Sequence, residues 1–475
     1  MRLIAILLAF CLFAAAPASA QLAVNARGVT FVPPSGGDDA PSIQQALDAM
    51  LFDYKTDKQT GTVYLAGRYE IGAPLVSGDP DDGYKQAVAI RGLGHATLVY
   101  TGPRTDDYLL RMHGAAKRNW GHARTILDNI KLDCNWNCRG LLLQRQYHFQ
   151  HVSNLYIRGA RQSALDRTTC WMSPMTNIHI ENGIGFAMRD DTTEGIDIRM
   201  FRVGYYHTAI HADDYADRNN PDAHWRATSE MIDYEGEHGI AETKEKYGNK
   251  YLEDWPPVKD ESIRNRSETT PRPGTLGSPR LQIPDADRAL IWVGGRAFRM
   301  QSVTLEANNT GRRPQITIDD QASRNVIIDG MYIEANRTYG EYIHWQAMNT
   351  DASQETQALK VSNITLAHWR KGRRNCDYFI RVDTPHRSGT NTSSSRLAIH
   401  DLWARGLKGV VYCATGKHYG YDLHGIRTSY ADGVNRSSGI MPSEWVTLAD
   451  GAQYFPGTPY GTDHKIGQYI REWSH

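Results

Sequence analysis

The chain has 475 residues, and its 53 lysines and arginines balance its 53 aspartates and glutamates. This balance argues against a nucleic-acid-binding protein, which usually has a clearly basic surface, and it gives no general attraction to anionic membranes. Hydrophobic residues make up 40% of the chain, which is enough for a large core and excludes wholesale disorder.

The first 20 residues have the pattern of an export signal. Arg2 precedes an apolar stretch over residues 3–15, and small residues follow up to Ala20. We predict a signal peptide over 1–20 with cleavage after Ala20, and hence a secreted or periplasmic protein. The apolar stretch is too short to cross a bilayer as a helix, so we predict no membrane span.

The rest of the chain, 21–475, is predicted to form a single domain with an odd number of cysteines. Export permits disulfides, but an odd number leaves at least one cysteine outside an intramolecular pair. The pairing stays open among Cys134, Cys138, Cys170, Cys376 and Cys413. Cys134 and Cys138 lack a matching second pair of ligands, so we predict no zinc site and assign no metal ligands.

Residues 29–60 are predicted to cap one end of the fold. After a β-like run at 29–32, Asp38 or Asp39 is suited to begin a helix, and Pro41 fits its first turn. This helix has one apolar face, formed by Ile43, Ala46, Leu47 and Met50. Short β-like runs separated by glycines follow at 62–65, 69–71, 88–91 and 97–100.

From residue 128 onward the chain repeats a short motif in which apolar and outward-facing residues alternate, usually after Asn or another small polar residue. The copies are DNIKLD (128–133), SNLYIR (153–158), TNIHIE (176–181), EGIDIR (194–199), QSVTLE (301–306), DGMYIE (329–334), SNITLA (362–367), HDLWAR (400–405) and HGIRTS (424–429). They recur every 18 to 38 residues apart from one long gap, which indicates a repeat architecture. Because the alternation has period two, each copy is a half-buried strand, and we predict an all-β, right-handed parallel β-helix.

The gap between Arg199 and Gln301 breaks this rhythm. A polar stretch over 242–287 predicts a long loop insertion at about 213–290. The insertion can be interpreted as a functional loop or as an unstructured segment, and both interpretations stay open at this point.

The first strands and the cap also resemble a known family. The segments SGGDDAPSIQQALDAM, GTVYLAGRYEIGAPL (61–75) and IRGLGHATLVY (90–100) are similar to the opening of pectate-lyase-superfamily and glycoside hydrolase 28-related β-helix proteins, with Ala66 in the position of the family's proline. YIEAN (332–336) is similar to a rung of that family. The resemblance implies a parallel β-helix and a polysaccharide substrate, but not a particular reaction. Some relatives form homotrimers, so a trimer stays open.

Glu306 and Glu334 are the first candidates for catalysis. The best-matched copies are offset by 28 residues, so these outward glutamates would lie about 5 Å apart if their coils are adjacent. Like charges at that distance raise one pKa, and retaining glycosidases use such a pair. Asp329 is a third carboxylate nearby. An incidental pair and a cation-binding pair remain alternatives.

Other outward residues suit sugar binding. Tyr156, Tyr332 and Trp403 offer flat rings for sugar faces. The arginines that would bind acidic groups are Arg158, Arg199 and Arg337. In the gap, His211 and Asp213 alternate in a strand-like run and would act as acid or base, or hold a divalent cation together with Asp214.

These residues leave three functions open. Glycoside hydrolysis, which requires no cofactor, is slightly favoured, with Glu306 and Glu334 as the acidic pair. A polysaccharide lyase would use a base such as His211 with Arg199, Arg337 or a cation such as calcium as the neutralising group. A non-catalytic glycan-binding β-helix would need the aromatic residues but not the carboxylates.

Overall fold

The computed structural model describes residues 28–53, 61–79, 85–114, 125–146, 151–208, 234, 238, 240–247, 289–318, 325–345, 358–367, 376–382, 396–405, 407, 409–413, 421–429, 446–448 and 453–454. The predicted signal peptide lies outside these residues. Among them, no helix is long and apolar enough to cross a membrane.

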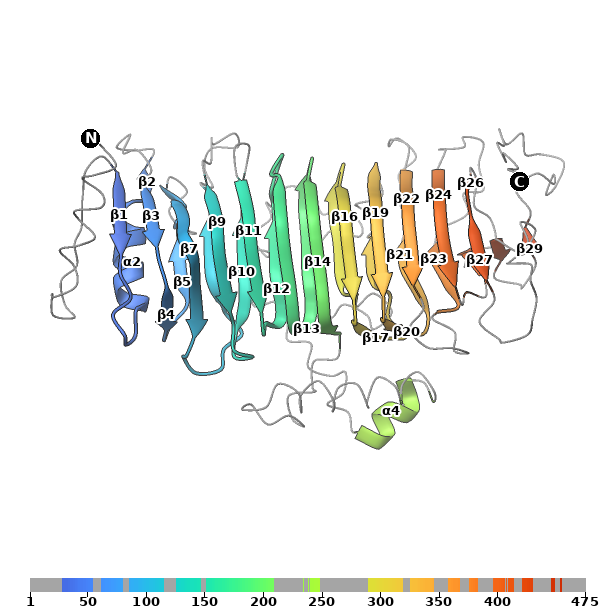
Figure 1. Ribbon diagram of the computed structural model, residues 1–475, viewed down its shortest axis with the longest axis horizontal. Coiled ribbons are helices and arrows are strands. Elements are labelled where there is room, and N and C mark those ends of the chain that lie inside the picture. Colours follow the sequence, from blue (N-terminus) through green and yellow to red (C-terminus); the bar gives the residue numbers. More distant parts are fainter. Residues whose placement is uncertain are drawn as a thin grey trace, which may run out of the picture.

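Most of the described chain forms strands that pair in parallel with the equivalent strands of neighbouring coils, so that the coils stack into one long body (Figure 1). One stack contains the repeated motif: β1 (Val29–Val32), β3 (Thr62–Leu65), β4 (Arg68–Ile71), β7 (Ala89–Tyr100), β9 (Ile126–Asp133), β11 (His151–Arg158), the first part of β13 (Met175–Glu194), β14 (Asp197–His207), β16 (Arg299–Glu306), β19 (Val326–Glu334), β22 (Ala358–Ala367), β24 (Arg396–Arg405), β26 (Tyr421–His424) and β27 (Arg427–Ser429). The predicted parallel β-helix is confirmed, and the right-handed crossover is the hand that such connections strongly prefer.

A second stack runs along another side of the same coils. Its strands are β5 (Leu75–Ser77), β8 (Tyr108–His113), β10 (Arg139–Gln144), β12 (Arg161–Thr168), the second part of β13, β15 (Ile291–Arg296), β18 (Ile316–Ile318), β21 (Glu341–Trp345), β23 (Tyr378–Val382), β25 (Gly409–Cys413) and β28 (Val446–Leu448). Short strands complete the set: β2 (Phe52–Asp53), β6 (Lys85–Gln86), β17 (Asn309–Gly311), β20 (Arg337–Thr338) and β29 (Gln453–Tyr454).

The predicted cap is confirmed as helix α2 (Ala40–Ala49). Its apolar face, Ile43, Ala46 and Leu47, is buried in the same hydrophobic cluster as the first strands. A second helix, α4 (Ile240–Tyr247), which the sequence did not predict, falls within the predicted insertion and is drawn below the ends of the strands in Figure 1.

A left-handed residue divides each motif strand and explains the polar start of the motif. The residues with positive φ at this position are Asn129, Asn154, Asn177, Met200, Ser302, Gly330, Asn363, Asp401 and Gly425. Asn and Gly tolerate this conformation better than other residues, because a short polar side chain or a missing Cβ limits the steric cost. The side chains also link rungs, since the Asn177 Nδ2 donates to the Asn154 Oδ1 at 2.8 Å.

The fourth copy of the motif was assigned five residues too early. The left-handed position there is Met200, so the strand in register with the other copies is Arg199–Gly204, not 194–199. Phe201 and Val203 point into the core, and Arg199 is paired with Gln301 instead of with Glu306. A methionine at the bend gives no polar signal, which is why the pattern was misplaced.

The interior is apolar, as the alternation predicted. Val303 and Leu305 of β16 and Met331 and Ile333 of β19 are all buried. The five cysteines outside the predicted signal peptide are buried as well, and no disulfide joins any two of them within the described residues.

Candidate functional site

The downstream half of each motif strand presents two rows of outward side chains. The first outward row consists of Lys131, Tyr156, His179, Arg202, Thr304, Tyr332, Thr365, Trp403 and Arg427, one from each successive rung. The second outward row consists of Asp133, Arg158, Glu181, Gly204, Glu306, Glu334 and Ala367. Since the register is regular, the backbones of neighbouring residues in a row are about 4.8 Å apart, which is the spacing of adjacent strands.

Glu181 of the second outward row has 21% of its side chain exposed, between Asp133 at 15% and Glu306 at 29%. The Tyr156 hydroxyl donates a hydrogen bond to its Oε1. Burial raises the pKa of Glu181 above its ordinary value, although the nearby charges of Lys131 and Arg202 oppose the shift. A carboxyl group with a raised pKa retains its proton at higher pH, as a general acid must.

His179 lies beside Glu181 and carries the opposite shift. Burial, followed by the charges of Arg202 and Lys131, lowers its pKa to about 4, so the imidazole is neutral near pH 7. Its Nε2 is 3.3 Å from Oε2 of Glu181, without the alignment of a hydrogen bond. The ring of Tyr156 packs edge-on against His179, with centroids 4.8 Å apart. Burial therefore favours the neutral form of both side chains.

Two cations lie on either side of this pair. Lys131 Nζ is 4.6 Å from the centre of the Tyr156 ring. On the other side, Arg202 donates to Glu306 Oε2 at 2.7 Å and is 47% exposed. Arg202 therefore connects the environment of His179 and Glu181 with Glu306.

Gly204 separates Glu181 from Glu306 in the second outward row. A Cβ placed on Gly204 would have one heavy-atom neighbour within 4 Å, the carbonyl oxygen of Glu306 at 3.6 Å. The row thus lacks a side chain between the two carboxylates, whose backbones are two rungs, or about 9.6 Å, apart. Inverting glycosidases separate their carboxyl groups by about 6.5–9.5 Å.

The pairing of Glu306 with Glu334 in adjacent rungs is as predicted. Their side chains have different partners, because Arg202 binds Glu306 while the Tyr332 hydroxyl donates to Glu334 Oε2 at 2.8 Å. That bond raises the pKa of Tyr332, and the charges of both glutamates add to the shift. The two carboxylates thus form one continuous acidic stretch with the Arg202 guanidinium at one end.

The other predicted residues divide into those on this face and those elsewhere. Tyr156, Tyr332 and Trp403 share the first outward row, and Trp403 is 53% exposed. Arg158 is in the second outward row, where its Nε lies 3.7 Å from Asp133 Oδ2. These four residues lie along the same face as the glutamates.

Asp329 and Arg199 precede the left-handed bend and do not join the two outward rows. Asp329 accepts hydrogen bonds of 2.8 Å from both Ser362 and Asn363, and the Asn363 bond helps hold its pKa below the ordinary value. Arg199 pairs with Asp197 of its own strand at 2.6 Å. The structure therefore gives both residues local structural partners.

The remaining predictions fall on other parts of the chain. His211, Asp213 and Asp214 lie outside the described residues, as does the side chain of Arg337. His207 is buried and its Nδ1 is 3.4 Å from Nδ2 of Asn309.

Sequence reasoning did not select His179, Lys131, Arg202 or Gly204. Two of them, Lys131 and His179, were visible as first outward residues of DNIKLD and TNIHIE, and they could have been found by aligning that position across copies. Arg202 and Gly204 were missed because the fourth copy was misplaced. The sequence analysis gives Glu181 no role, since its burial is not apparent from alternation.

Comparisons with known proteins concern the fold alone. No family model matches the chain, and no curated protein does. A similar solved structure is ORF18 of Geobacillus virus E2, at 8% identity over 83% of this chain and 62% of that chain, with a TM-score of 0.39. An Acinetobacter phage tailspike protein is similar at 10% identity over 89% of this chain and 64% of that chain, with a TM-score of 0.43. Endo-xylogalacturonan hydrolase from Aspergillus tubingensis is also similar, at 9% identity over 90% of this chain and 100% of that chain, with a TM-score of 0.41.

The chain spans less than two thirds of the length of the two viral proteins. The parallel β-helix expected from the family resemblance is the fold that the strand register defines.

Proposed function

We propose that the protein is a secreted enzyme that hydrolyses glycosidic bonds of a polysaccharide, with Glu181 as general acid and Glu306 as general base. The observation that carries this proposal is the contrast between the two carboxylates. Glu181 is desolvated and has a raised pKa, whereas Glu306 is bound by Arg202. A carboxyl group of raised pKa and a second carboxylate bound by a guanidinium are suited to the two roles of an acid–base pair.

The reaction follows from these states. Glu181 gives its proton to the glycosidic oxygen, which leaves with the bonding electrons of the broken C–O bond. Glu306 takes a proton from a water molecule, whose oxygen forms the new bond to the anomeric carbon from the opposite side. One water molecule is therefore consumed, its oxygen ending on one product and a proton on the other. Before the next turnover, the proton that Glu306 took from water must be replaced on Glu181. A gap of two rungs leaves room for that water and favours inversion at the anomeric carbon.

Substrate binding is assigned to the first outward row. Tyr332 and Trp403 are 40% and 53% exposed and continue this row beyond Glu306. Their rings are suited to stack on sugar faces, while Arg202 and Lys131 provide charges for an acidic or hydroxyl-rich ring. A glycan running along the strand stack would contact several rungs.

Glu306 and Glu334 remain the alternative acidic pair. They lie in adjacent rungs, about 4.8 Å apart along the backbone, which is the shorter spacing that retaining enzymes use. In that case Tyr332 would help position Glu334. The two assignments predict opposite product stereochemistry.

A polysaccharide lyase is the second candidate function, and the state of His179 favours it. A neutral imidazole flanked by Arg202 and Lys131 can abstract a proton next to a uronate carboxylate whose charge the cations neutralise. Neither reading requires a cofactor in this region. A lyase leaves an unsaturated uronate, which absorbs ultraviolet light, whereas a hydrolase does not.

The test uses the purified chain without its first 20 residues on a panel of neutral and uronate polysaccharides. Reducing ends and ultraviolet absorbance are measured together. Reducing ends without absorbance support hydrolysis, and both signals together support the lyase. If both stay absent while the protein still binds a glycan of the panel, the protein is a binding module and the catalytic proposal fails.

A further inference from the structure

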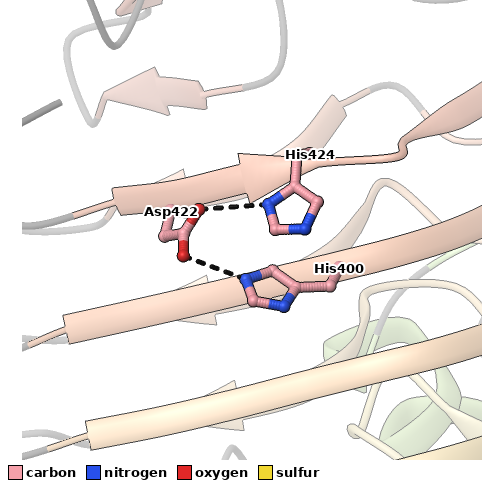
Figure 2. Close-up of side chains that lie close together, drawn as sticks. All are labelled: His400, Asp422 and His424. Carbon is pink, nitrogen blue, oxygen red and sulfur yellow. Dashed lines mark hydrogen bonds and ion pairs between the residues drawn. The ribbon is translucent and has the colours of Figure 1, made fainter. Parts of the chain in front are cut away.

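A second cluster of titratable side chains lies near the C-terminal end of the stack, well along the chain from the candidate site. His400 on β24 and Asp422 and His424 on β26 point toward one another from two neighbouring strands (Figure 2). The imidazole rings are stacked, with centroids 3.8 Å apart and planes inclined by 30°. The cluster belongs neither to the first nor to the second outward row.

The β-helix register creates this cluster. His400 and His424 are register partners in adjacent rungs, each just before the left-handed residue of its strand. Asp422 precedes His424 by two residues, so alternation places its side chain on the same side of the strand. Consequently, three side chains of the kind that bind metals come close together, and each is held by a paired strand.

The nitrogen and oxygen atoms that face each other have the spacing of metal ligands. His400 Nε2 is 3.0 Å from Asp422 Oδ2, and His424 Nδ1 is 3.1 Å from Asp422 Oδ1. All three groups have a ligand atom within 4.8 Å of the others. Two ligands bound at 2.0–2.1 Å with tetrahedral angles lie about 3.3 Å apart, so small side-chain movements suffice to receive an ion.

From this geometry we infer that His400, Asp422 and His424 bind a divalent transition-metal ion of the zinc type. Two imidazole nitrogens and one carboxylate suit Zn²⁺ or Co²⁺, whereas Ca²⁺ and Mg²⁺ prefer sites made of oxygen atoms. Three protein ligands leave at least one coordination position for water or an outer ligand. The side chains are 17%, 49% and 33% exposed in this order, so an ion has access from solvent.

The ordinary alternative is a hydrogen-bonded triad, in which both imidazoles donate a proton to one carboxylate. The same atoms serve both arrangements, because a bound cation takes the place of the imidazole protons that the hydrogen-bonded triad would direct at Asp422. A titration with the ion separates the two arrangements. The inference does not depend on the proposed hydrolysis.

The test is a calorimetric titration of Zn²⁺ alone into the untagged full chain, after removal of metals with a chelator. We expect one equivalent of tight binding, with Ca²⁺ and Mg²⁺ unable to compete at equal concentration. His400→Ala, His424→Ala and Asp422→Asn should each weaken this binding more than tenfold. The matched control is His95→Ala, which removes an exposed histidine of another strand and should leave the titration unchanged.

A second readout keeps the test independent of folding defects. Co²⁺ should give the visible absorption of a tetrahedral site in the original chain, and Asp422→Asn, which preserves size, should lose it while its circular dichroism stays the same. Saturating Zn²⁺ should raise the Tm of the original chain but not of that variant. Absence of zinc binding, or undiminished binding in the three variants, would overturn the inference.

Discussion

Two neighbouring parts of the second outward row carry similar carboxylates in different surroundings. Around β13 and β14, Glu181 is packed against Tyr156 and His179, and burial shifts the pKa of both the glutamate and the histidine. Two and three rungs from Glu181, Glu306 and Glu334 point outward from β16 and β19, where Arg202 and Tyr332 are their respective polar partners. The comparison teaches that position in the repeat selects which residues point outward, whereas packing from adjacent rungs decides their chemistry.

The largest expected effect separates the two carboxylate pairs. Glu181→Gln keeps the size of the side chain but removes the exchangeable proton, so kcat on an active glycan should fall by about 10³-fold. Glu334→Gln should lower kcat by less than tenfold, because Glu334 transfers no proton in the proposed reaction. Steady-state kinetics on both variants checks the contrast, and the reverse order of effects would assign catalysis to Glu306 and Glu334.

The absence of a side chain at Gly204 provides a test that changes no charge. Gly204→Leu should place an apolar branch between Glu181 and Glu306 and lower kcat/KM by about 10²-fold, since it occupies the position proposed for water and sugar. Gly204→Ala is the control, because its Cβ meets only the Glu306 carbonyl oxygen at an ordinary 3.6 Å. Equal activity of both variants would show that the reaction takes place elsewhere.

The shifted pKa of His179 predicts a pH-dependent loss of stability. Unfolded, the imidazole takes a proton near pH 6.5, but folded it stays neutral down to about pH 4. Between these values the unfolded state binds more protons, so the free energy of unfolding falls as the pH is lowered from 6.5 to 4. Because the side chain is partly exposed, we expect on the order of 2 kcal/mol.

Urea unfolding at pH 7 and pH 4.5 measures this loss, and His179→Gln should reduce it. The raised pKa of Glu181 acts in the opposite direction, since the folded state then binds more protons as the pH rises above the glutamate's ordinary range. The comparison is therefore made in a Glu181→Gln background. An unchanged loss in the double variant would assign the pH dependence to other groups.

The smallest expected effect concerns Lys131, whose charge lowers the pKa of both Glu181 and His179. Lys131→Met should raise the pKa of both groups and move the alkaline limb of the pH–rate profile upward by less than about one unit. Because Glu181 is the proposed general acid, only the alkaline limb should move. A shift of the acidic limb alone would contradict the roles given to the two carboxylates.

The sequence was sufficient for the fold and for the direction of most side chains. Period-two alternation and the asparagines before it predicted the strands, and the 28-residue offset predicted that Glu306 and Glu334 are neighbours. Met200 at the fourth bend hid the positions of Arg202 and Gly204. The burial of Glu181 and the shift of His179 depend on side chains from rungs about 25 residues away, which no local pattern reveals. His400 and His424 each begin a copy of the motif, yet Asp422 lies before its copy and was overlooked.

The stereochemistry of the product tests the central claim most directly. Proton NMR recorded in the first minutes of hydrolysis of an active glycan identifies the anomer that forms before mutarotation. The pair Glu181 and Glu306, two rungs apart, predicts an inverted anomer. A retained anomer would contradict this assignment and support the adjacent pair Glu306 and Glu334.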